Sequence, residues 1–126
     1  MANNSQAKTI RIGAGAAWWG DRVEPAALNA EKGALDYLCY ETMAEATVSA
    51  AQVRARRDPS FEGYDTYLDD RMRAVLPACM RQGTRIITNQ GWINPDAAAR
   101  QRLPMHPSPM RLVCALRPAR PPVKRR

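Results

Sequence analysis

The pattern that most constrains the fold of this chain is an alternation of strand-length apolar segments with helical segments. The segments 8–13, 35–41 and 84–89 have the length and residue types of short strands. Segment 35–41 is apolar almost throughout, which is typical of a strand buried on both faces of a parallel sheet. Since the order is β-α-β-α-α-β-α and short crossovers are right-handed, the sequence predicts an α/β fold with a three-stranded parallel sheet and flanking helices.

Helical spacing and end signals place the segments between the strands. Pro25 stands in a first helical turn and Gly33 follows the last turn of the same helix. Gly83 ends a longer helix in which Pro77 is expected to produce a kink or a split. The predicted helices cover residues 24–32, 42–57, 65–82 and 95–102.

The cysteines and the single histidine exclude several kinds of chemistry. Cys39, Cys79 and Cys114 are an odd number and lie far apart, so they match neither a disulfide framework nor a CxxC metal site. They are expected to be ordinary buried thiols. His106 lies outside the body of helices and strands, which excludes a catalytic triad and a histidine-containing metal site. The sequence therefore predicts no metal site and identifies no cofactor.

Charge and proline content divide the chain at about residue 102. Residues 1–102 carry 13 basic and 12 acidic side chains, whereas residues 103–126 carry six basic and no acidic ones. Six of the ten prolines also fall in 103–126, so this tail and the polar segment 1–7 are expected to be disordered. Two interpretations of the tail stay open: a basic interaction arm, or an out-of-frame extension, which its Arg, Pro and Ala content favours.

Length and hydropathy narrow the class of protein further. The chain is long enough for one domain, here 8–102, and no apolar run approaches the ~18–20 residues that a membrane span needs. The N-terminal residues are too polar for a signal peptide, so a cytoplasmic protein without a membrane partner is expected. The balanced charge of the body argues against nucleic-acid binding. Since a small sheet leaves an open edge, a homo-oligomer or a partner protein covering that edge is expected.

Candidate functional residues collect where the predicted strands end, because the carboxyl ends of parallel strands carry the sites of such folds. Asp21 and Glu41 are candidates for a general acid/base pair, although such carboxylates also cap helices or pair with an arginine such as Arg22. Trp18 and Trp19 either wall an apolar pocket or pack beneath their loop. The predicted substrate-binding residues are Gly13, Gly15, Trp18, Trp19, Arg22, Asn89 and Asn94.

A nucleotide site is one alternative for this edge. Gly13, Gly15 and Glu41 imitate the dinucleotide-binding fingerprint, but Trp18 replaces its third glycine and the helix begins near Glu24. The glycines are equally explained by a tight backbone turn. A small nucleotide-binding α/β module therefore stays open as an alternative function, as does an adaptor that binds acidic partners through its basic tail.

Two blocks of the chain, 8–52 and 64–100, resemble the N-terminal part of the acyclic terpene utilisation (AtuA-like) family. The resemblance is carried by three motifs: G-x-G-x-x-x-x-G-D-R over 13–22, L-D-Y-L-x-x-E over 35–41, and I-I-T-N-x-G-x-x-N-P over 86–95. It implies a role in the catabolism of acyclic terpenes such as citronellol and geraniol, with a terpenoid acyl-CoA or another small molecule as ligand. It assigns no catalytic residue.

The same resemblance also bears on completeness. Members of the family are several times longer, and this chain leaves the family pattern after Arg100. The resemblance therefore implies a truncated piece of a larger α/β domain that is inactive by itself.

Overall fold

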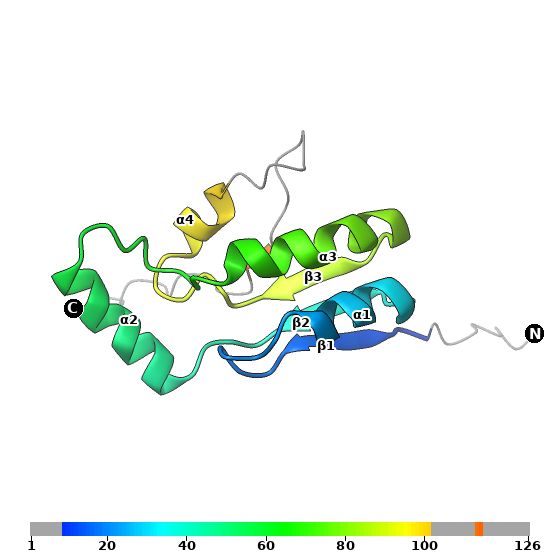
Figure 1. Cartoon of the computed structure of the whole chain (residues 1–126), viewed down its shortest axis with the longest axis horizontal. Helices are drawn as coiled ribbons and strands as arrows, with labels where there is room; N and C mark the ends of the chain where they lie inside the picture. The colour runs from blue at the N-terminus through cyan, green and yellow to red at the C-terminus, as the bar shows by residue number, and fades with distance from the viewer. Residues whose placement is uncertain (1–8, 102–112, 115–126) are drawn as a thin grey trace, which may run out of the picture.

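The computed structural model describes residues 9–101 and 113–114 (Figure 1). It confirms an α/β fold with a parallel sheet and flanking helices. The elements are β1 (Ile12–Ala16), α1 (Glu24–Lys32), β2 (Tyr37–Tyr40), α2 (Glu45–Arg57), α3 (Leu68–Gln82), β3 (Arg85–Thr88), α4 (Pro95–Arg100) and β4 (Val113–Cys114).

The strands lie in the order β1-β2-β3-β4, and each neighbouring pair is parallel. Strand β4 differs from the prediction, because no strand is expected from the sequence of residues 103–126. Val113 and Cys114 pair with Ile87 and Thr88 and so add a fourth, two-residue strand beside β3. The predicted disorder of 1–7 and of the rest of 103–126 falls outside the described residues.

Strand β1 corrects the prediction of a strand over 8–13 followed by a glycine loop. The strand begins only at Ile12 and continues to Ala16, with an irregular register between Ala14 and Ala16. The glycines stay extended because their missing side chains admit close neighbours. A Cβ on Gly13 would lie 2.4 Å from the Leu35 side chain, and one on Gly15 would lie 2.6 Å from the Tyr40 ring.

The helices end close to the predicted residues, but α3 begins at Leu68, three residues later than predicted, and two further differences concern α2 and Pro77. Helix α2 starts only at Glu45, since Ala44 is extended. Helix α3 continues through Pro77, so of the two expected effects of this proline, a kink or a split, the split is wrong. A proline removes the hydrogen bond to the carbonyl four residues earlier, here that of Arg73, whose exposed position leaves this carbonyl within reach of water. As predicted, Gly83 ends α3, in the left-handed region with φ +72.

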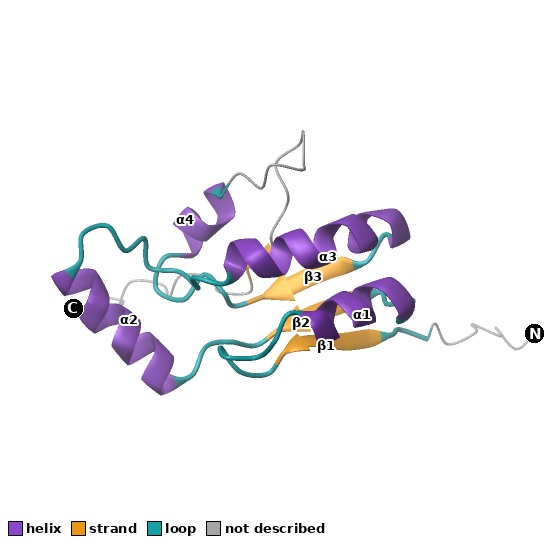
Figure 2. Ribbon diagram, viewed as in Figure 1, coloured by secondary structure: helices purple, strands orange, loops and turns teal. Residues whose placement is uncertain are grey.

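Helices α1 and α3 lie side by side on one face of the sheet (Figure 2). Right-handed crossovers between strands in sequential order place successive helices on the same face. The core lies beneath them, and Leu38, Met72 and Val75 are fully buried within it. Arg81 of α3 also pairs with Glu31 of α1 at 2.7 Å.

The opposite face of the sheet lies open in the part of the chain that the structure describes. Leu38 and Tyr40 point toward the helices and are buried, whereas Tyr37 and Cys39 alternate with them and are only partly buried. The prediction that segment 35–41 is buried on both faces is therefore wrong, and so is the prediction of a buried Cys39 thiol. Cys79 is buried in α3, as predicted.

Helix α2 lies beyond the carboxyl ends of the strands, away from α1 and α3 (Figure 1). None of the helices in the described ranges is long and apolar enough to cross a membrane.

Candidate functional site

A hollow of about 610 Å³ lies on the open face of the sheet, toward the carboxyl ends of the strands. Its apolar floor comes from Ile12 and Ala14 of β1, Cys39 of β2 and Ile87 of β3. These positions alternate with the residues that face α1 and α3, as the two-residue period of a strand requires. Strands β1, β2 and β3 therefore each contribute to the core with one face and to the hollow with the other.

The polar rim of the hollow is formed where β2 and β3 end, by Glu41 and Asn89. Asn89 Nδ2 donates to Glu41 Oε1 at 2.7 Å, and Asn89 Oδ1 accepts from the backbone N–H of Thr42 at 2.8 Å. The N–H of Met43 donates to the same Glu41 oxygen at 2.9 Å. The loops after β2 and β3 therefore converge as expected, and they hold the Glu41 carboxylate in one orientation.

The second candidate carboxylate, Asp21, has a different surrounding. Its Oδ2 accepts from the N–H groups of Ala17 and Trp18 at 2.7 and 3.0 Å, which closes the loop after β1. Asp21 lies outside the lining of the hollow. Within the described residues, Arg22 forms an ion pair with neither Asp21 nor Glu41. The expected acid/base pair is thus divided between a loop-holding carboxylate and a rim carboxylate.

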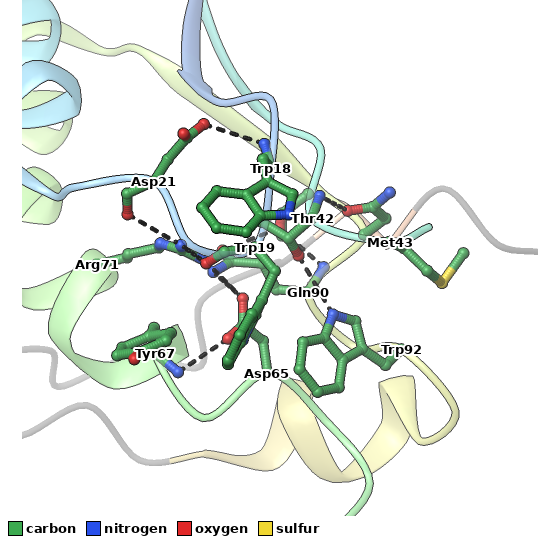
Figure 3. Close-up of polar contacts among 12 residues, drawn as sticks. Trp18, Trp19, Asp21, Thr42, Met43, Asp65, Tyr67, Arg71, Gln90 and Trp92 are labelled. Atoms are coloured by element: carbon green, nitrogen blue, oxygen red, sulfur yellow. Dashed lines mark hydrogen bonds and ion pairs between the residues drawn. The ribbon is translucent and has the colours of Figure 1, made fainter. Parts of the chain in front are cut away.

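A buried polar network that the sequence analysis missed supports the loops from below (Figure 3). Arg71 Nη1 donates to Asp65 Oδ2 at 2.6 Å, and both side chains are almost completely buried. The other guanidinium nitrogen, Nη2, donates to the carbonyls of Trp19 and Asp21. Gln90 Nε2 also donates to Asp65 Oδ2, at 3.0 Å. One arginine of α3 therefore ties the loop after β1 to the loops that precede α3 and follow β3.

The two tryptophans of the first loop separate. Trp18 is 61% exposed, and its ring lies over Gly20. Trp19 packs with Tyr67 at 5.5 Å and with Trp92 at 6.4 Å between ring centroids (Figure 3). Neither residue lines the hollow. Of the two interpretations, the structure supports packing beneath the loops for Trp19.

The remaining predicted binding residues fall into two groups. Gly13 lines the hollow, whereas Gly15, Arg22 and Asn94 lie outside its lining. Asn94 caps α4, because its Oδ1 accepts from the N–H of Ala97 at 3.2 Å and its Nδ2 donates to a backbone carbonyl at 2.8 Å. Asn94 therefore holds a loop in place.

The glycine segment also differs in geometry from a dinucleotide loop. Gly13 and Gly15 lie inside β1, and α1 begins only at Glu24, with Val23 at its N-cap. A pyrophosphate bound at the glycines would need a helix N-terminus directly after them. Packing against Leu35 and Tyr40 is the observed role of these glycines.

Burial dominates the electrostatics of the groups behind the site. Loss of solvation raises the pKa of the Tyr40 hydroxyl far above its usual range, and the neighbouring Cys79 raises it further. Burial also raises the pKa of the Cys79 thiol. The pKa of Tyr64 rises to about 12, first through burial and then through its hydrogen bond to Glu62. Among the described residues, no group of three or more potential metal ligands lies together.

The floor of the hollow was missed by sequence reasoning, although a signal existed. Ile12 and Ile87 stand at alternate positions of their strands, so they point to the face opposite Leu38 and Ile86. An exposed apolar floor was not expected, because both faces of the predicted sheet were expected to be covered by helices.

The fold and the site define a class of protein: a parallel α/β domain with an apolar hollow at the carboxyl ends of its strands. The family model of the acyclic terpene utilisation family protein AtuA matches residues 10–106. Because this match covers most of the chain, the protein belongs to that family, and its general role is acyclic terpene utilisation. No curated protein and no solved structure was found to match the chain.

Proposed function

We propose that the chain binds the hydrocarbon part of an acyclic terpenoid in the hollow, in the catabolism of terpenes such as citronellol and geraniol. The observation that carries this proposal is an apolar floor on one face of the sheet with a polar rim at its carboxyl end. Family membership supports the substrate class.

The size and lining of the hollow support a ligand of this kind. Small-molecule sites usually measure about 300–1,000 Å³ and combine apolar walls with a few polar groups. The hollow of about 610 Å³ falls within this range. Each methylene group removed from water contributes about 0.8 kcal/mol, so an acyclic chain of about ten carbons gains most of its binding energy from the floor.

A terpenoid acyl-CoA is one form in which the ligand reaches this site. The hollow is open to solvent, so the hydrocarbon chain lies on the floor while the coenzyme A group stays outside. Trp18 and Arg22 are exposed residues of the neighbouring loop after β1 that such a group meets.

We further propose that the chain acts as part of a larger assembly and does not turn substrate over alone. Ile12, on the open face of β1, is 67% exposed, and β1 forms one edge of the sheet. Exposed apolar side chains beside an open sheet edge mark a surface that another protein segment covers. The proposed cover is a second copy of the chain or a partner protein.

Protection of Cys39 from alkylation tests the binding proposal, because its thiol lies in the floor of the hollow. Geranoyl-CoA is expected to slow alkylation of Cys39 by iodoacetamide, measured by mass spectrometry of the cysteine peptides. Acetyl-CoA, which lacks the hydrocarbon chain, is the ligand control. NAD tests the nucleotide alternative, and equal protection by NAD contradicts the proposal.

Paired variants localise the effect. I87E places a charge in the floor and is expected to weaken geranoyl-CoA protection at least about tenfold, which corresponds to ~1.4 kcal/mol. V53E adds the same charge on α2, where Val53 is 46% exposed and outside the lining, and is expected to leave protection unchanged. Protection that survives I87E refutes binding in the hollow.

A further inference from the structure

Among the described residues that line the hollow, the carboxylate of Glu41 is the single charged side chain. The apolar residues of this described lining cannot neutralise a ligand charge, and none of its members is basic. A ligand head group bound beside Glu41 therefore lies next to a carboxylate and meets no basic side chain among the described lining residues.

Glu41 is also held as an acceptor. Both hydrogen bonds to its side chain, from Asn89 and from the N–H of Met43, go to Oε1. In the part of the chain that the structure describes, Oε2 has no hydrogen-bond partner, and Glu41 is exposed at the rim. A carboxylate fixed through one oxygen presents the other oxygen in a constant direction, which favours a ligand that donates a hydrogen bond.

The hydroxyl of Thr88, a further polar residue of the lining, is occupied. The hydroxyl of Thr88 donates to Gln90 Oε1 at 3.0 Å and accepts from the Gln90 N–H at 3.1 Å. It points into the buried network and does not compete with Glu41 for the ligand.

We infer that this site takes its acyclic terpenoid as a neutral hydrogen-bond donor, a terpene alcohol, and that Glu41 discriminates against the corresponding carboxylate. The inference rests on the proposed binding of a terpenoid in the hollow. An alcohol donates a charge-assisted hydrogen bond to Glu41, whereas a carboxylate head group is repelled by it and finds no cation among the lining residues that the structure describes. A thioester or an ether is neutral but has no hydrogen to donate, so its affinity falls between the two.

A matched ligand series tests this inference. Geraniol, geranyl methyl ether and geranate share one hydrocarbon chain and differ in the head group. Half-protection of Cys39 from alkylation is expected at the lowest concentration for geraniol. Geranate is expected to need at least about tenfold more, in line with the loss of one hydrogen bond to a charged group. The ether is expected to fall between them.

The variant E41Q separates the role of charge from that of shape. Glutamine keeps an oxygen for Asn89 and Met43, so the loop stays in place while the negative charge is lost. The preference for geraniol over geranate is expected to shrink at least about fivefold in E41Q. E45Q, which removes a neighbouring exposed carboxylate at the start of α2, is expected to retain it.

The outcomes distinguish this inference from the function beneath it. If none of the three ligands protects Cys39, both the proposed function and this inference fail. If all three protect equally, the terpenoid site stands and the assignment of Glu41 is overturned. A preference that persists unchanged in E41Q also overturns it.

Discussion

The two faces of the sheet use the same three strands for opposite purposes. On one face, Leu38 is fully buried beneath α1 and α3 together with Met72 and Val75. On the other face, Ile12 is 67% exposed, and Cys39 and Ile87 form the floor of an open hollow. Neighbouring residues such as Leu38 and Cys39 therefore belong to two different environments.

Under the proposed function, stability and binding are carried by separate sets of side chains. The covered face supplies the buried apolar area, at about 25 cal/mol per Å², on which the fold depends. The open face leaves apolar area in water, which is costly to the isolated chain and becomes favourable only when a ligand or another protein segment covers it. Substitutions can test this division one face at a time.

The largest expected effect comes from the ion pair on the covered side of the sheet. R71A leaves Asp65 buried without its cation and deprives two loop carbonyls of their donor. It is expected to lower the free energy of unfolding by about 3–5 kcal/mol, measured by urea denaturation. R81A removes the exposed pair with Glu31 and is expected to cost less than about 1 kcal/mol. Equal losses of unfolding free energy in R71A and R81A would contradict the expected difference between the buried and the exposed ion pair.

A smaller effect is expected where the two faces meet in consecutive residues. L38A opens a cavity in the core and is expected to cost about 2–4 kcal/mol of unfolding free energy. C39A removes a small, partly exposed side chain from the other face and is expected to cost less than about 1 kcal/mol. The same urea series measures both, and a C39A cost as large as that of L38A means that the open face is covered in solution.

The smallest effect concerns Tyr40, whose buried hydroxyl has no hydrogen-bond partner within the described residues. Because burial raises its pKa, the folded state keeps the phenol neutral where the unfolded state ionises. The contribution of the neutral Tyr40 phenol to the free energy of unfolding is therefore complete below about pH 10. It is lost as the pH rises above that value.

Y40F removes this proton linkage together with the unpaired hydroxyl. It is expected to make the alkaline loss of unfolding free energy shallower, and to leave stability at pH 7 equal or higher by about 1 kcal/mol. Urea denaturation between pH 7 and pH 10.5 measures both effects. Y37F, on the open face, is the control and is expected to retain the full alkaline loss.

Much of the fold was predictable because hydrophobic period and end signals agree along the chain. Pro25, Gly33 and Gly83 placed the helix ends within a few residues of those observed. The extent of β1 was not predictable, since Gly and Ala are poor strand formers and only the close approach of Leu35 and Tyr40 explains their extended conformation. The two-residue β4 has too little sequence pattern to be recognised.

The site was predictable in its location but only partly in its members. Glu41 and Asn89 follow from the rule that parallel sheets bind ligands at their carboxyl ends. Asp21 and Asn94 satisfy the same rule, yet their side chains hold loops, and no sequence pattern separates a loop-holding carboxylate or amide from a ligand-binding one. From the sequence alone, Arg71 is expected to be an exposed charge on a helix. Its burial with Asp65 was not predictable, because burial of an ion pair depends on segments that are distant in the sequence.

The arrangement of the tryptophans gives this protein a built-in optical probe. All three, Trp18, Trp19 and Trp92, lie in loops beyond the strand ends and none lies between α1, α3 and the sheet. Trp18 is 61% exposed and is expected to emit as an indole in water, whereas Trp92 is 8% exposed and is expected to emit at shorter wavelength and to resist ionic quenchers. Tryptophan fluorescence therefore reports the unfolding of the loops, while circular dichroism follows the helices. A comparison of the two signals shows whether the loops unfold before the helices or together with them.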